Sequence, residues 1–196
     1  MIAALYVQKN GCYWDLPGVD PWDEQRDARL YAGPWPVVAH PPCQLWVNFA
    51  ALNFKRWGGE HNRPGNDGGC FAAALASVRA WGGVLEHPAS SKAWAAHDLT
   101  PPGAFGWTRE AWGPGWVCEV AQSAYGHRAR KLTWLYYVGA AAPPPLNWAR
   151  PEGTAQIGKF DRNRPTLQGK AASVTPPAFR ELLLSLARLS RREEAR

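Results

Sequence analysis

Pro36-Val37-Val38-Ala39-His40-Pro41-Pro42-Cys43-Gln44 is the stretch around which the chain is organised. A short β-branched run is typical of a buried strand. Two prolines then end it, because proline lacks the N–H that a strand ladder or a helix interior needs. Cys43 is therefore predicted on a stiff turn just beyond the carboxyl end of a strand, the edge where open α/β sheets bind ligands. A thiolate is a strong nucleophile, whereas a lone cysteine is more commonly a small buried apolar residue.

A second short strand is predicted at Val84-Leu85, with Glu86-His87-Pro88 at its carboxyl end. It follows a helix predicted between Asp67 and Gly82. Strand-helix-strand units of this kind are parallel, with a right-handed crossover. Cys43 and Glu86 should therefore emerge at the same edge of the sheet, about 4.8 Å apart if the two strands are neighbours.

The rest of the chain reads as one α/β domain over residues 1–190, followed by a basic tail at 191–196. Thr175 is expected to cap a last helix, which lines one face with Phe179, Leu182, Leu183, Leu186 and Leu189. Further strands are predicted at 2–7, 117–120 and 132–138, and further helices at 24–31 and 44–57.

Composition narrows the class of protein. The 196 residues are 46% hydrophobic, which is enough for a core, and the net charge of +6 suits an anionic partner such as DNA or a nucleotide. The four cysteines form no Cys-x-x-Cys pair, which argues against a zinc ribbon. No secretory signal opens the chain, so a cytoplasmic setting is expected. The uncharged run at 132–149 contains three consecutive prolines and is not a membrane span, so no membrane partner is expected.

A thiol and a carboxyl group that face one pocket can carry out pyrimidine chemistry. A Cys43 thiolate can add to C6 of the ring, and a Glu86 carboxyl with a raised pKa can protonate N3. C5 of the adduct is then nucleophilic and can accept a methyl group. Arg128, Arg130 and Lys131 are expected to orient the base and its phosphate.

Four motifs, in order, resemble those of the DNA C5-cytosine methyltransferases. Pro41-Pro42-Cys43-Gln44 is similar to their Pro-Cys-Gln nucleophile motif, and Glu86-His87-Pro88 to their Glu-Asn-Val/Pro motif. Tyr125-Gly126, the basic residues after it and the strand ending at Gly139 resemble their Tyr-Gly strand pair with its Gln-x-Arg-x-Arg element. Residues 169–177 resemble the final Gly-Asn-x-Val-Pro-Pro motif, which helps to bind S-adenosylmethionine.

The resemblance implies a Rossmann-like three-layer α/β sandwich of the methyltransferase type. It implies S-adenosylmethionine-dependent methylation of cytosine C5 in DNA, with the base flipped out of the duplex, in a bacterial or phage-infected cell. The implied roles are catalysis for Cys43, Glu86, Arg128 and Arg130; cofactor binding for Val7, Asn10, Gly11, Asp20, Pro42, Ser173 and Val174; and substrate binding for Pro41, Gln44, His87, Pro88, Tyr125 and Lys131.

The chain also departs from the family pattern. The family's Phe-x-Gly-x-Gly loop is replaced by Val7-Gln8-Lys9-Asn10-Gly11, and His87 stands where an asparagine braces the cysteine loop. Residues 140–168 are too few for a target-recognition domain. Low sequence specificity is therefore expected, unless a protein partner supplies recognition.

Three alternatives remain open from the sequence. The same covalent adduct could serve C5 modification without S-adenosylmethionine, since the glycine loop is missing. The domain could be a non-catalytic methyltransferase-like binder of DNA or protein, with salt-sensitive DNA affinity. His40, Cys43 and His87 could hold a metal, although their spacing matches no standard zinc pattern.

Overall fold

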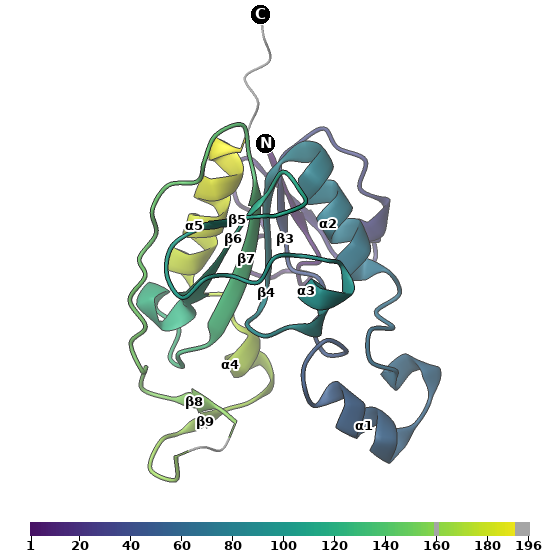
Figure 1. Ribbon diagram of the computed structural model, residues 1–196, viewed down its shortest axis with the longest axis vertical. Helices are drawn as coiled ribbons and strands as arrows, with labels where there is room; N and C mark the ends of the chain where they lie inside the picture. Colours follow the sequence, from purple (N-terminus) through teal and green to yellow (C-terminus); the bar gives the residue numbers. More distant parts are fainter. Residues whose placement is uncertain (159–160, 191–196) are drawn as a thin grey trace, which may run out of the picture.

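A seven-stranded sheet in the order β2-β1-β3-β4-β7-β6-β5 forms the centre of the computed structural model, which describes residues 1–158 and 161–190 (Figure 1). The expected basic tail at 191–196 lies outside the described residues. The strands are β1 (Ile2–Leu5), β2 (Val19–Trp22), β3 (Val37–Ala39), β4 (Gly83–Pro88), β5 (Thr108–Arg109), β6 (Trp116–Ala121) and β7 (Leu132–Val138).

Half of the sheet is parallel and half is antiparallel. β1 pairs in parallel with β2 and β3, and β3 pairs in parallel with β4. β7 then runs antiparallel to both β4 and β6, and β5 is antiparallel to β6. The molecule is thus a mixed α/β domain, as the alternation of predicted strands and helices indicated.

Helices cover both faces of the sheet. Along β3 the side chains alternate, so that Val37 and Ala39 join the core beneath α2 (Cys70–Trp81), whereas Val38 joins the core beneath α5 (Pro177–Leu189). Phe71 of α2 and Phe179 of α5 are fully buried on these opposite faces.

The predicted β3-α2-β4 crossover is present. The Asp67 carboxylate accepts the backbone N–H of Phe71 at 2.9 Å and of Gly69 at 3.0 Å, and so satisfies donors at the start of α2. The helix ends at Gly82, and Gly83 has a φ of 118°. A Cβ at Gly83 would lie 1.9 Å from the carbonyl oxygen of Val37, so only glycine lets β4 start beside β3.

Two predicted helices differ in the structure. Residues 24–31 contain only the 3₁₀ turn η1 (Ala28–Leu30), because Asp27 adopts a left-handed conformation with a φ of 50°. The helix predicted from residue 44 is α1 (Ala50–Trp57). The residues before α1 form turns, and Trp46 lies among them. Its buried indole N–H donates to the Asp67 carboxylate at 2.9 Å, and this anchor explains why the helix begins late.

The last helix also corrects two predictions. Its N-cap is Pro176 and no side chain caps it, so Thr175 does not have the predicted role. Leu189 is 56% exposed, whereas Leu184 is buried with Phe179, Leu183 and Leu186. The buried stripe of α5 is therefore wider than the predicted one and stops before its last residue.

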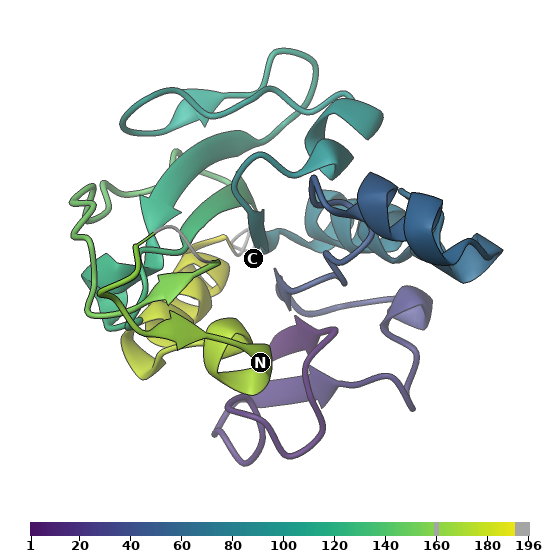
Figure 2. The ribbon, with the colours of Figure 1, turned by 90° about the horizontal axis from the view of Figure 1, so that it is seen from below.

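The segments beyond the carboxyl ends of β3 and β4 lie together at the bottom of Figure 1, with α1 on one side and α4 on the other in Figure 2. No helix within residues 1–158 and 161–190 is long and apolar enough to cross a membrane. The remaining short elements are η2 (Glu60–Asn62), α3 (Lys92–Ala96), η3 (Gln122–Tyr125), β8 (Gln156–Ile157), β9 (Thr166–Leu167) and α4 (Gly169–Ser173).

Candidate functional site

His40, Cys43 and Glu86 meet at the carboxyl edge of β3 and β4. The parallel register pairs Ala39 with Leu85, so His40 and Glu86 are the next residues along each strand. Nδ1 of His40 lies 3.1 Å from Oε2 of Glu86. Cys43 follows on the Pro41-Pro42 turn, half-buried, and is close enough for the Glu86 charge to raise its pKa. The predicted parallel pairing of β3 with β4 is therefore confirmed, and it places the Cys43 turn and Glu86 at one edge of the sheet.

A hydrogen-bond network fixes the Glu86 carboxylate. The Tyr13 hydroxyl lies 2.9 Å from Nε2 of His40, and His40 in turn contacts Glu86. On the other side, the Gln122 amide donates to Oε1 of Glu86 at 3.1 Å and to the Thr133 hydroxyl at 2.9 Å. Bonds from both sides hold the carboxylate in one orientation.

The charge state of Glu86 differs from the prediction. Burial favours the neutral acid, but the hydrogen bond and charge of His40 outweigh it, with Lys131 and His87 adding to the effect, and lower the pKa of Glu86 to about 2. The free protein therefore holds a carboxylate here, and not the neutral carboxyl group with a raised pKa that the sequence suggested.

Cys43 is a thiol in the free protein. Burial is the main influence that raises its pKa, followed by the negative charge of Glu86, whereas Lys131 lowers it. The charge of Lys131 thus lowers the pKa of both predicted catalytic side chains.

His87 lies behind the cysteine loop. Its Nδ1 is 2.7 Å from the Ser91 hydroxyl, and its ring packs against Phe71 with centroids 5.1 Å apart. Burial lowers the pKa of His87 to about 4, against a raising influence from Glu86 and from the Pro41 and Pro42 backbone. Nε2 has no partner in hydrogen-bond geometry among the described residues. The buried ring packs behind the cysteine loop on the α2 side of the sheet.

Several other predicted site residues have partners of their own. Arg130, predicted as catalytic, forms an ion pair with Glu152. Both hydrogen bonds of the Tyr125 hydroxyl join it to the Asn147 backbone, and its ring packs on Phe179, so it has a packing role. Within the loop and strand that hold the site, Pro41 is buried, Gln44 is exposed, and Pro88 is the last residue of β4.

The predicted cofactor residues do not form one cradle. Val7 is buried, and Asn10 and Gly11 lie in the turns that join β1 to β2 without a helix. The Asp20 carboxylate is already engaged by Arg26 at 2.6 Å and by the Trp22 indole at 2.8 Å. The remaining members are the exposed Pro42, next to Cys43, and Ser173 and Val174, at the end of α4.

These positions do not fit S-adenosylmethionine as the resemblance implies. The family's glycine-rich loop leaves room for the cofactor against the backbone, whereas a Cβ on Gly11 would lie 2.7 Å from the Gln8 carbonyl oxygen, within a tight turn of the chain on itself. The Asp20 carboxylate, which the resemblance assigns to cofactor binding, already forms an ion pair with Arg26.

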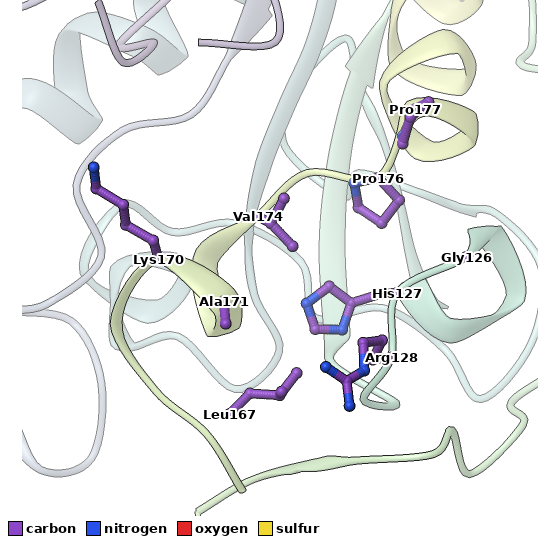
Figure 3. A pocket seen from close by; sticks show the side chains of 9 residues that line it. All are labelled: Gly126, His127, Arg128, Leu167, Lys170, Ala171, Val174, Pro176 and Pro177. Carbon is purple, nitrogen blue, oxygen red and sulfur yellow. The ribbon is translucent and has the colours of Figure 1, made fainter. Parts of the chain in front are cut away.

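A cavity of about 460 Å³ lies between the segment Gly126–Arg128 and the residues from Leu167 to Pro177 (Figure 3). It contains the predicted residues Arg128 and Val174. The charge of Lys131 lowers the pKa of His127, as it lowers those of Cys43 and Glu86.

No protein-family model, curated protein or solved structure matches this chain. The chemistry of the site therefore has to be argued from its own residues. Among the described residues, no three His, Cys, Asp or Glu side chains are grouped so that they could hold a metal ion. This arrangement gives no support to the alternative of a metal held by His40, Cys43 and His87.

Sequence reasoning missed Tyr13, Gln122 and Thr133, and it considered His40 only as a metal ligand. No local pattern marks the first three, which come from separate segments: Gln122 contacts Glu86 directly, Tyr13 contacts His40, and Thr133 accepts from Gln122. His40 could have been predicted as part of the site, because it lies at the end of the strand that leads to Cys43.

Proposed function

We propose that this protein modifies C5 of a pyrimidine ring through a covalent adduct between Cys43 and C6 of the base. The observation that carries the proposal is the meeting of Cys43 with a hydrogen-bonded Glu86 carboxylate at one edge of the sheet. Cytosine in DNA is the substrate and S-adenosylmethionine the methyl donor that the ordered motifs favour.

The sheet supports the methyltransferase-type, Rossmann-like fold. Helices lie on both faces of a sheet whose strands β2, β1, β3 and β4 are parallel, and β7 is reversed between β4 and β6. A reversed strand at this place is typical of the methyltransferase-type sheet. The candidate nucleophile follows β3, at the carboxyl edge where such sheets bind ligands.

The residues present account for the covalent part of the reaction. Cys43 loses its proton to solvent, and its sulfur forms a bond to C6. The C5–C6 π electrons then shift through C4 toward N3. Glu86 takes up a proton from solvent, for which the adjacent His40 ring offers a path, and delivers it to N3, where it neutralises the developing charge. C5 then takes up an electrophile and releases its original proton to solvent. The electrons of that C–H bond re-form the C5–C6 double bond as the sulfur–C6 bond breaks, the thiolate leaves, and N3 returns its proton to Glu86.

We derive no step through S-adenosylmethionine, because the residues assigned to it do not form its site. The minimal reaction needs no cofactor: a solvent deuteron is the electrophile, and hydrogen at C5 exchanges with D₂O. The same exchange is expected if the protein modifies C5 without S-adenosylmethionine, because that reaction passes through the same adduct.

Exchange at C5 tests the proposal directly. Cytosine mononucleotide and a cytosine-containing oligonucleotide are incubated with the protein in D₂O, and loss of the H5 proton signal is followed by NMR. We expect exchange with the unaltered protein and with Cys12→Ala, a change at an exposed cysteine. We expect none with Cys43→Ala. Equal exchange in the Cys43→Ala protein would refute the covalent mechanism.

Titration with S-adenosylmethionine tests the donor separately. Calorimetric binding, followed by a stable Cys43 adduct with 5-fluorocytosine DNA only when the cofactor is present, would support methyl transfer. Absence of binding at millimolar concentrations would restrict the proposal to chemistry without this cofactor.

A second candidate is a non-catalytic DNA-binding domain. The raised pKa of Cys43 favours it, because the resting thiol is not activated. This candidate predicts DNA binding that weakens with salt and is unchanged by Cys43→Ala, without any exchange at C5.

A further inference from the structure

Helix α1 projects from the body of the molecule and exposes large apolar side chains. It lies at the bottom of Figure 1, away from the sheet, and packs mainly against η2. Only Ala50 of its residues is buried. Phe49 at its N-cap, Leu52 and Trp57 are 68%, 59% and 67% exposed. Large apolar side chains that gather in this way on a surface indicate a binding surface.

The same helix carries unpaired positive charge. Lys55 and Arg56 are exposed, and neither forms an ion pair with a carboxylate of residues 1–158 or 161–190. The sequence has no acidic residue between positions 44 and 59. In contrast, Arg63 in the segment that follows pairs with Glu60 at 2.6 Å. The charge on α1 therefore favours an anionic partner.

Cations and aromatic rings share one side of α1. Phe49, Leu52 and Arg56 are spaced by three and four residues, so they lie on the same side of the helix. The guanidinium of Arg56 lies 4.8 Å from the centroid of the Trp57 ring. A helix that lies in a membrane surface keeps its cations on the face opposite its apolar side chains, so a lipid surface fits α1 poorly. Rings beside cations are the pattern that binds single-stranded nucleic acid, because bases stack on the rings and phosphates meet the cations.

We propose that α1 binds a single-stranded nucleic acid, with bases stacked on its two exposed rings and phosphates beside Lys55 and Arg56. A duplex fits less well, because its bases stack on one another and do not offer their faces. The helix follows the Cys43 turn along the chain, and both lie beyond the carboxyl ends of β3 and β4. A strand would present its bases already unpaired, so no base would have to leave a duplex. As a statement about the substrate this inference rests on the proposed function, whereas binding on α1 does not require that Cys43 reacts.

Fluorescence anisotropy with labelled oligonucleotides tests the proposal on the full chain. The probe is a short oligodeoxythymidine, which has no hydrogen at C5 to exchange, and at equal salt it should bind about tenfold more tightly than a duplex of the same length. Trp57→Ala should weaken strand binding about tenfold, because a base loses its stacking partner, whereas Trp57→Phe should retain most of the affinity. Trp112→Ala is the matched control, since Trp112 is 90% exposed between β5 and β6.

The salt dependence of strand binding gives a second readout. Lys55→Gln with Arg56→Gln should reduce the slope of log affinity against log salt by about 1.4, because each phosphate contact in a single strand contributes about 0.7. The matched control is Arg109→Gln with Arg188→Gln, which removes the same charge at exposed positions on β5 and α5 and should leave the slope unchanged.

Binding by Cys43→Ala separates this inference from the proposed function. This variant should bind the strand as tightly as the unaltered protein. Strand binding without C5 exchange would mean that the proposed function fails and this inference holds, and exchange of the mononucleotide without strand binding would mean the reverse. The inference is also overturned if the duplex binds as tightly as the strand, if polyglutamate or phosphatidylserine vesicles bind more tightly, or if the control variants lose as much affinity as the α1 variants.

Discussion

His40 and Glu86 occupy equivalent positions at the ends of two neighbouring parallel strands, and Nδ1 of His40 lies 3.1 Å from Oε2 of Glu86. Both side chains are largely buried, with 15% and 12% of their surface exposed. This contact keeps Glu86 ionised in spite of its burial, so the acid-base behaviour of the site belongs to the pair and not to Glu86 alone.

Replacing His40 should raise the pKa of Glu86. In His40→Asn the burial of the carboxyl group remains, while its strongest stabilising partner is lost, so the pKa should rise from about 2 toward or above its ordinary value of 4.5. A ¹³C NMR titration, with the signal assigned by Glu86→Gln, measures this change. Tyr13→Phe is the control, because it removes a hydrogen bond to His40 but retains the imidazole. An unchanged Glu86 titration in His40→Asn would contradict the assignment.

The reactivity of Cys43 should follow the two charges beside it. Lys131→Met removes the cation that lowers the pKa of the thiol, so alkylation by iodoacetamide at mildly alkaline pH should slow several-fold. Glu86→Gln removes the opposing charge and should accelerate it. Peptide mapping by mass spectrometry separates Cys43 from the other three cysteines, and Lys55→Met is the charge control. If both variants change the rate in the same direction, electrostatics does not control this thiol.

His87 should make the protein lose stability in acid. Its pKa is lowered to about 4 in the fold and is about 6.5 in the unfolded chain, so the unfolded state binds more protons between these values. The free energy of unfolding should therefore fall as pH drops from 6.5 to 4, by roughly 3 kcal/mol at 1.36 kcal/mol per pKa unit. Urea denaturation at several pH values measures it.

In His87→Gln this part of the pH dependence should disappear, even if the variant is less stable at neutral pH. His61→Gln is the matched control, since His61 is exposed in η2. A pH profile of stability that is the same in His87→Gln and the unaltered protein would show that His87 does not carry the effect.

The stability of the sheet edge beside β5 should depend on the buried carboxylate of Glu110. The Glu110 side chain is 1% exposed, pairs with Arg79 at 2.6 Å and accepts the Tyr136 hydroxyl at 2.7 Å. Arg79→Met leaves this charge without its cation and should lower the free energy of unfolding by about 2–3 kcal/mol. Arg63→Met, which breaks the exposed pair with Glu60, should cost less than about 0.5 kcal/mol in the same assay. Similar losses in both variants would refute a special role for Glu110.

Local patterns predicted the elements that hold the candidate nucleophile. The Val37-Val38 run, its proline stop and the helix before Gly82-Gly83 each carry a short-range signal, and parallel pairing of β3 with β4 follows from the crossover rule. The same reasoning brought Cys43 and Glu86 to one edge. It extended helices too far at 24–31 and 44–49, because Asp27 adopts a left-handed conformation and Trp46 is anchored by Asp67, a partner distant in the chain.

The charge states of the site residues and their hydrogen-bond and ion-pair partners could be determined only from the folded structure. Whether Glu86 is an acid or a carboxylate depends on His40 and Lys131, which the chain brings from other segments, so its pKa was predicted in the wrong direction. Arg128 and Arg130 are two residues apart, yet one lines a cavity and the other pairs with Glu152. Periodicity is a local property and determines strands and helices, whereas pKa values, ion pairs and cavities arise from contacts between distant residues, which only tertiary packing creates.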